Sequence, residues 1–311
     1  MTGEELLLDL RPERVEASLA RSAGTHVLGD GRTLAYDEHG DPGGRPVFWL
    51  HGAPSCRLEA IAAGSWGERA GVRWIAPDRP GLGGSSLRRG GGALDVASDI
   101  AALADALGLA RFAVFGGSGG GPYALACAAA LAPRLDAVVC SAPGGVAAEA
   151  PAVAGWVDRL ASALARHAPL LLHAYFRVMG LAAAVPSAVL SAAAVGVEAP
   201  LVRAAVRTGL GRALLRETFR QGTQGAVDDF RRLGDFGFRL GAIGTPVLFV
   251  QGTRDPFVPV EQTRAFARLT PGSRLVELEG AGHGGAIFAR DRIAAELGWA
   301  PRPPGSAPGG A

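Results

Sequence analysis

Short apolar segments alternate with segments of helical periodicity along most of the chain. The apolar segments carry few charged residues, which is typical of strands that are buried on both faces of a parallel sheet. We predict strands at residues 26–28, 33–36, 46–50, 72–76, 112–115, 135–141, 246–252 and 274–278. Because strands that alternate with helices pair in parallel, we expect an α/β fold with a mostly parallel, doubly wound sheet of about eight strands.

Turn and helix signals separate these strands. Asp30-Gly31 lies between the first two predicted strands and indicates a hairpin there. In residues 94–107, Leu103 and Leu107 are four positions apart, as on one face of an amphipathic helix. We predict helices at residues 94–107, 124–131, 260–269 and 287–297, the last preceded by a glycine-rich loop at 279–284.

The pattern changes between residues 146 and 240. Strand signals vanish there, and stretches rich in alanine, leucine and arginine are broken by prolines. We expect a helical cap at residues 146–240, inserted into a core formed by residues 24–145 and 241–298. Residues 1–23 are expected to form a charged helix or arm, and residues 299–311, mostly Pro, Gly and Ala, a disordered tail.

The amino-acid composition excludes several kinds of catalytic and binding chemistry. The 31 basic and 29 acidic residues nearly cancel, so nothing points to nucleic acid. Every basic residue is arginine, which excludes a P-loop lysine, a Schiff base and a Ser-Lys pair. The three cysteines, Cys56, Cys127 and Cys140, lack C-x-x-C spacing, so neither disulfides nor a cysteine zinc site is indicated. We expect no cofactor and no metal.

The sequence favours a cytoplasmic protein. Its first five residues contain acids where a signal peptide would carry basic residues. Residues 178–197 are uncharged and have the length of a membrane span, about 20 residues, but they are mostly alanine and include Gly180 and Pro186. We expect buried cap helices there, and the sequence does not favour a membrane partner.

A glycine-rich motif joins one predicted strand to a helix. Gly116-x-Ser118-x-Gly120 follows the apolar residues 112–115 and precedes an alanine-rich segment. In a nucleophile elbow, a serine occupies a strained position in a sharp strand-to-helix turn, and the flanking glycines avoid collisions. The N–H groups at the start of the following helix would favour negative charge near the serine.

Two other interpretations of this motif stay open at this point. It can be a glycine-rich loop with an incidental serine. It can also be a dinucleotide-binding turn, since Gly119, Gly121 and Ala124 fit G-x-G-x-x-A. That pattern begins late relative to the strand, however, and Pro122 interrupts it. Only the nucleophile elbow predicts partners elsewhere in the chain.

A serine nucleophile needs a base, and histidine suits that role. His283 follows the last predicted strand between two glycines and is the best candidate. His51 is expected to brace a turn rather than to transfer protons. The remaining histidines are interpreted as surface or packing residues: His26, His39, His167 and His173.

The histidine in turn needs an acid that holds its tautomer. Asp255 lies in a loop after a predicted strand, where its side chain can reach such a histidine. A turn carboxylate or a salt bridge with Arg254 is the alternative. Asp228 and Asp229 lie in the expected cap and are weaker candidates. Asp78 belongs to an Asp-x-Pro-Gly turn and is interpreted as structural.

Residues 51–54, His-Gly-Ala-Pro, follow the strand at 46–50. The glycine permits a close turn, and the N–H of Ala53 is left free beyond the strand end. A free N–H near a serine nucleophile is what an oxyanion hole requires. An ordinary turn after a strand explains these residues equally well when they are taken alone.

Taken together, these motifs resemble the α/β-hydrolase superfamily across residues 25–298. The resemblance rests on the order Ser118, Asp255 and His283, on the glycine motif around Ser118, and on the turns at residues 51–54 and 78–81.

The resemblance implies the α/β-hydrolase fold, a helical cap at about 146–240 that sets the substrate, and an oxyanion hole formed by the N–H groups of Ala53 and Gly119. Haloalkane dehalogenases and classical epoxide hydrolases of this superfamily carry aspartate where this chain has Ser118. Those two activities are therefore not expected.

The sequence thus predicts a carboxylesterase-like serine hydrolase. Ser118 would be the nucleophile, His283 the base and Asp255 its acid, acting on a small or medium apolar ester, lactone or amide. A C–C bond hydrolase, a proline-releasing aminopeptidase and a perhydrolase of the same fold stay open, as does a capped-pocket binder or non-hydrolytic catalyst. The expected partner is a small-molecule substrate, and the oligomeric state, including a homodimer, is left open.

Overall fold

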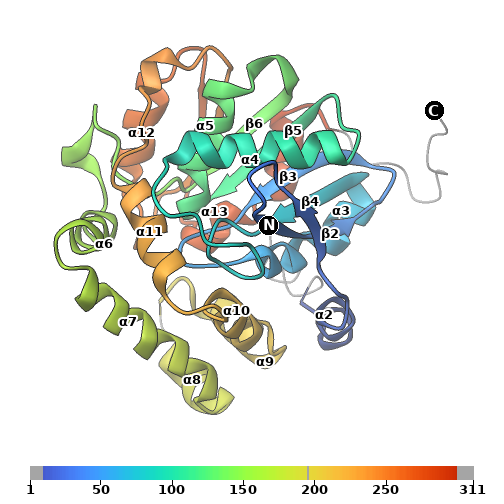
Figure 1. Ribbon diagram of the computed structural model, residues 1–311, viewed down its shortest axis with the longest axis vertical. Coiled ribbons are helices and arrows are strands. Elements are labelled where there is room, and N and C mark those ends of the chain that lie inside the picture. Colours follow the sequence, from blue (N-terminus) through green and yellow to red (C-terminus); the bar gives the residue numbers. More distant parts are fainter. Residues whose placement is uncertain (1–9, 195, 300–311) are drawn as a thin grey trace.

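A computed structural model of the chain describes residues 10–194 and 196–299. It contains one sheet of eight strands in the order β1-β2-β4-β3-β5-β6-β7-β8, with helices on both sides (Figure 1). The β1–β2 and β2–β4 pairs are antiparallel and all others are parallel, which confirms the predicted fold class. The strands are β1 Gly24–Val27, β2 Thr33–Gly40, β3 Arg45–Leu50, β4 Val72–Pro77, β5 Phe112–Gly117, β6 Leu135–Ser141, β7 Leu248–Gly252 and β8 Arg274–Leu278.

The helices fall into a core set and a set inserted between β6 and β7. The core helices are α2 Pro12–Leu19, α3 Gly64–Ala70, α4 Ala93–Ala106, α5 Gly121–Ala130, α12 Val260–Leu269, α13 His283–Ile287 and α14 Arg290–Glu296. The inserted helices are α6 Trp156–His167, α7 Pro169–Leu181, α8 Ser187–Ala193, α9 Ala199–Arg207, α10 Leu210–Thr218 and α11 Gln224–Leu233.

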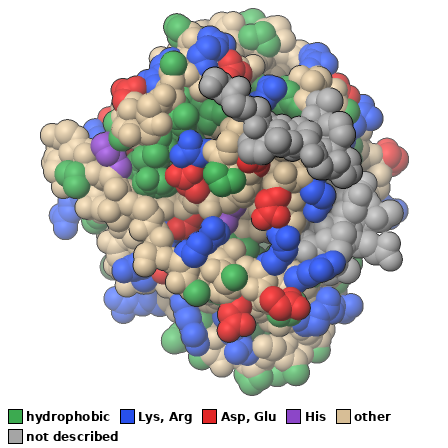
Figure 2. All heavy atoms as spheres, turned by 90° about the vertical axis from the view of Figure 1, so that its right-hand side faces the viewer, with side chains coloured by type: hydrophobic (Ala, Val, Ile, Leu, Met, Phe, Trp, Pro, Cys, Tyr) green, Lys and Arg blue, Asp and Glu red, His purple; other side chains and the backbone are tan. Residues whose placement is uncertain are grey.

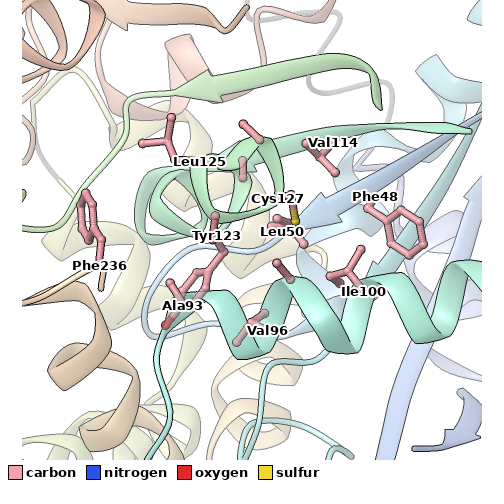
Figure 3. Close-up of a cluster of buried hydrophobic side chains, with 14 of the residues drawn as sticks. Phe48, Leu50, Ala93, Val96, Ile100, Val114, Tyr123, Leu125, Cys127 and Phe236 are labelled. Carbon is pink, nitrogen blue, oxygen red and sulfur yellow. The ribbon is translucent and has the colours of Figure 1, made fainter. Parts of the chain in front are cut away.

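Both faces of the sheet are covered by apolar packing. In β3, Phe48 and Leu50 belong to the hydrophobic cluster under α4, α5 and α12 (Figure 3). Val47 and Trp49, which alternate with them, belong to the cluster under α3, α13 and α14. This two-sided burial explains why the strand sequence is apolar at successive positions rather than at every second one.

The helical insertion contains α6 to α11 and, in the part of 146–240 that the structure describes, no strand. The expectation that residues 178–197 form buried helices is wrong, because Val178, Leu181 and Val189 are 67%, 69% and 56% exposed. Among the described helices, none is by itself long and apolar enough to cross a bilayer. Pro169–Ala184 and Ser187–Ala193 meet that criterion only together, as a pair bent by 120°.

Two boundaries at the C-terminal end of the chain differ from the sequence predictions. Of the expected arm, α2 is described, while residues 1–9 lie outside the described part, as do residues 300–311 of the expected tail. Trp299 is not part of a tail: it packs against the core, with the Arg45 guanidinium 4.6 Å from its ring centre. The predicted final helix at residues 287–297 is shorter and begins later, as α14, because Ile287 ends α13 and the backbone leaves the helical conformation at Ala289 (ψ 45°).

Replacing Phe48 by alanine should lower the free energy of unfolding by about 3–5 kcal/mol, since the ring is fully buried and its removal leaves a cavity. Urea denaturation followed by circular dichroism measures this change. Val27→Ala is the control, because Val27 is 67% exposed and should change stability by less than about 0.5 kcal/mol. Equal effects of the two substitutions would contradict the assignment of the core.

Candidate active site

Ser118 lies in a sharp turn between β5 and α5. Its φ is 52°, in the left-handed region that non-glycine residues rarely occupy. The glycines of the motif are required by space: a Cβ at Gly116 would collide with the carbonyl of Gly120, and one at Gly120 with the carbonyl of Leu50. The glycine motif therefore holds Ser118 in a strained backbone conformation at the end of a central strand.

Asp255 and His283 are joined directly. His283 Nδ1 lies 2.7 Å from Asp255 Oδ2, and the N–H groups of Phe257 and Val258 donate to Asp255 Oδ1 at 2.8 and 2.9 Å. Burial works against the charged carboxylate, but these hydrogen bonds, led by that of His283, hold the pKa of Asp255 below its usual value. An ionised Asp255 accepts the Nδ1 proton of His283 and so leaves Nε2 as the basic nitrogen.

The elbow and the helix that begins at His283 lie against each other. A Cβ at Gly117 would lie 3.2 Å from the Ile287 side chain of α13. Among the described residues, no hydrogen bond joins Ser118 Oγ to His283. Such bonds are often long or absent when no substrate is bound, so this does not argue against the pair, whose members both follow carboxyl ends of parallel strands.

Ala53 and Gly119, which the family resemblance implied as donors of an oxyanion hole, lie close to each other. A Cβ at Gly119 would lie 2.9 Å from Ala53 N, so only glycine fits at position 119. In the described part of the chain, the N–H of Ala53 has no hydrogen-bond acceptor. It is thus available to a ligand beside Ser118.

His51 braces the turn at residues 51–54, as predicted. It is completely buried, its Nδ1 donates to the carbonyl of Gly52 at 2.9 Å, and its Nε2 accepts the N–H of Arg79 at 3.3 Å. Burial holds the pKa of His51 well below its usual value, so the imidazole is neutral. Both ring nitrogens are occupied, which leaves none for proton transfer.

A buried ion pair that the sequence did not predict supports the same turn. The Arg79 guanidinium donates to Asp229 at 2.9 and 2.7 Å, to the carbonyl of Gly52 at 2.7 Å and to the carbonyl of His51. The Tyr123 hydroxyl also donates to Asp229, at 2.6 Å. Arg79 and Asp229 are 150 residues apart, and no local signal pairs them. Asp229 belongs to α11 of the helical insertion, so it is a structural link between insertion and turn.

Glu59 is a second carboxylate that the sequence did not single out. Its side chain accepts the N–H of Gly52 at 3.0 Å and the indole N–H of Trp49 at 3.1 Å. A Cβ at Gly52 would lie 3.3 Å from Glu59 Oε2 and 3.5 Å from the Cβ of Ser118. Burial raises the pKa of Glu59 above its usual value. The carboxyl group therefore fixes the turn from the side that faces Ser118.

Asp78 has the structural role that its turn sequence predicted. It accepts the backbone N–H groups of Arg57 and Gly84 at 2.7 and 2.8 Å and forms an ion pair with the Arg57 side chain. Burial raises the pKa of Asp78 to about 6 in spite of that pair. Arg57 also contacts Glu217 of α10 at 2.6 Å, a further link to the helical insertion.

Within residues 10–194 and 196–299, no three His, Cys, Asp or Glu side chains are grouped so that they could hold a metal ion. Cys56, Cys127 and Cys140 are buried and not joined by disulfides.

A family model described as alpha/beta hydrolase fold matches residues 45–289. Among curated proteins, none matches this chain. Similar solved structures include an alpha/beta hydrolase fold protein from Nakamurella multipartita, 27% identical, TM-score 0.61, covering 89% of this chain and 98% of its own. An enol-lactonase from Burkholderia xenovorans LB400 is 21% identical, with a TM-score of 0.62, and the match covers 88% of this chain and 97% of the enol-lactonase. A thermophilic esterase from Thermogutta terrifontis is 20% identical, with a TM-score of 0.60, and the match covers 89% of this chain and 97% of the esterase.

Asp229→Asn should lower the free energy of unfolding by about 3–5 kcal/mol at pH 7, because Arg79 would be left buried without a counter-charge. The Arg79 charge and the hydrogen bonds outweigh burial and hold the pKa of Asp229 below its usual value. The stabilisation is therefore present above the unfolded pKa, about 3.9, and is lost as the pH falls through the lower folded pKa.

Urea denaturation of the wild type and of Asp229→Asn between pH 7 and pH 3 measures the difference in their free energies of unfolding. This difference should be constant above about pH 5 and shrink below that. Asp235→Asn is the control, since Asp235 is exposed and accepts only the N–H of Gly237. A difference that grows on acidification would refute the role given to Asp229.

Proposed function

Because the chain belongs to the α/β-hydrolase superfamily, we propose that it is a serine hydrolase that uses Ser118, His283 and Asp255 on small or medium apolar esters, lactones or amides. The observation that carries the proposal is the Asp255–His283 hydrogen bond of 2.7 Å beside a turn that strains Ser118. A purely binding protein has no need for an ionised acid that fixes the tautomer of a histidine next to an elbow serine.

The proposed reaction runs through an acyl-enzyme. Ser118 Oγ attacks the carbonyl carbon while its proton passes to His283 Nε2, and the N–H groups of Ala53 and Gly119 stabilise the oxyanion. Collapse of this intermediate expels the leaving group, which takes the proton from His283. Water, activated by His283, then attacks the acyl group, and the acid leaves as Ser118 regains its proton. Asp255 stabilises the charged imidazolium in both steps.

Apolar esters and lactones fit the surroundings of His283. The Phe257 ring packs edge-on against the His283 ring, with centroids 5.4 Å apart, and offers an apolar wall rather than a charge. An enol-lactonase and an esterase are among the similar structures, which supports ester or lactone cleavage over other chemistries of the fold. We propose that the helical insertion acts as the cap over this site.

Ser118→Ala should reduce kcat/KM for p-nitrophenyl butyrate by about four to six orders of magnitude and abolish labelling by a fluorophosphonate probe, since triad members act as a unit. The matched control is Ser98→Ala, which removes an exposed hydroxyl on α4. A wild-type protein that the probe does not label, or equal labelling of Ser118→Ala, would show that Ser118 is not the nucleophile.

Asp255→Asn should lower kcat by about 10⁴-fold, because an amide at this position no longer fixes the Nδ1–H tautomer of His283. Asp136→Asn, at an exposed salt bridge with Arg111, is the control and should leave kcat unchanged. Steady-state kinetics of both variants measure the difference, and a kcat for Asp255→Asn close to that of wild type would rule out this acid.

Glu59→Leu should lower kcat by about 10²-fold with little change in KM, because the N–H of Gly52 loses its acceptor and the neighbouring Ala53 donor shifts. Glu59→Gln keeps an acceptor oxygen and should recover most of the activity. Equal kcat values for the two variants would mean that Glu59 acts only through bulk packing.

A further inference from the structure

One helix of the insertion exposes a row of large apolar side chains. On α7, Leu170, Leu171, Tyr175, Val178 and Leu181 are 81%, 63%, 59%, 67% and 69% exposed, and their spacing places them along one side of the helix. We call these five residues the α7 face. The helix α7 itself runs along the outer edge of the molecule, with α6 and α8 at its two ends (Figure 1). Soluble monomers rarely expose apolar side chains in such a continuous row.

A second group of exposed apolar side chains lies on α6 and beside the candidate active site. On α6, Trp156 and Leu160 are 69% and 51% exposed. Gly155, next to Trp156, lies so close to Phe257 that a Cβ on it would be 2.6 Å from the Phe257 carbonyl. Phe257 is itself 48% exposed and packs against His283. Exposed apolar side chains therefore occur on α7, on the neighbouring helix α6 and, at Phe257, in direct contact with His283.

The exposed charged residues on α6, α7 and α8 themselves are all arginines. Arg159 and Arg166 of α6 and Arg177 of α7 are exposed, and α8 contains no charged residue. The one acid in α6, α7 and α8 is Asp158, which is turned inward and accepts the N–H of Gly145 at 2.7 Å. The face shown in Figure 2, seen from the side opposite these helices in Figure 1, differs because acidic and basic side chains are intermingled on it.

We propose that the α7 face docks the protein onto an anionic lipid surface. Helices that lie in a bilayer interface combine an apolar side with arginines whose charged ends reach the headgroups, and anionic lipids add electrostatic attraction. A second copy of this chain fits less well, because a two-fold contact through the α7 face would bring Arg177 of each copy near that of the other. A membrane span does not fit either, since Pro169–Ala184 and Ser187–Ala193 are long and apolar enough to cross a bilayer only together, as a bent pair.

Docking through this surface would present the edge near Phe257 and His283 to the membrane. An apolar ester dissolved in the bilayer would then reach the enzyme without crossing water. This step rests on the proposed hydrolase function, whereas the docking itself does not. The two can therefore be tested separately.

The docking test uses Ser118→Ala, so that its result does not depend on catalysis. The protein is sedimented with vesicles of equal parts phosphatidylglycerol and phosphatidylcholine, and with vesicles of phosphatidylcholine alone. We expect binding to the mixed vesicles that is at least about tenfold stronger and weakens with salt. Absence of binding, or equal binding to both vesicle types, would overturn the proposal.

Substitutions distinguish the apolar from the electrostatic contribution. Leu171→Ser, Val178→Ser and Leu181→Ser combined should reduce binding by at least about tenfold, and Arg177→Gln by about fivefold with a weaker salt dependence. Val27→Ser, on β1 and 67% exposed, is the matched control. Equal melting temperatures show that each variant is folded. Unchanged vesicle binding by the triple variant would overturn the assignment of the α7 face. So would a parent protein that binds no vesicles but forms a dimer in sedimentation velocity, if the triple variant abolishes that dimer.

Discussion

The structure around Ser118 depends on one buried guanidinium. Taking an arginine charge out of water costs several kcal/mol unless its donors are all satisfied in the right directions. Arg79 meets this requirement with a carboxylate from α11 and two carbonyl groups of the turn at residues 51–54. Because Arg79 holds those carbonyls, the turn is fixed, and Ala53 N stays close to Gly119. Arg79 therefore fixes both the geometry of the turn and the position of the insertion.

The same kind of contact recurs across the boundary between core and insertion. Glu217 of α10 pairs with Arg57, and Glu198, which precedes α9, accepts the N–H groups of His283 and Gly284. Together with Asp229, these acids tie three helices of the insertion to loops at the carboxyl ends of core strands. A displacement of the insertion would thus disturb the 51–54 turn and the His283 loop at once. The shape of the site is therefore coupled to the position of the insertion.

Much of this arrangement could be predicted from the sequence, for identifiable physical reasons. Apolar strands buried on both faces have a recognisable pattern, and a glycine-flanked serine has few alternatives once a strand precedes it. Strand ends of a parallel sheet converge, which brought Asp255 and His283 together in the prediction and in the structure. The Arg79–Asp229 pair could not be predicted, since the two residues are 150 positions apart and both are of types that usually lie at the surface.

The expectation of buried helices at residues 178–197 is wrong because apolar periodicity does not say what covers an apolar face. In α7, Leu172 and Phe176 point inward, and the Phe176 ring packs against Phe219 and Phe230 with centroids 5.8 and 5.7 Å apart. This aromatic packing fixes the rotation of α7 about its axis, so turning the helix to hide Leu171 or Val178 would expose the rings instead. Within the described part of the chain nothing covers the outer face, so it loses its contact with water by meeting an apolar partner, and the arginines beside it determine which partner fits.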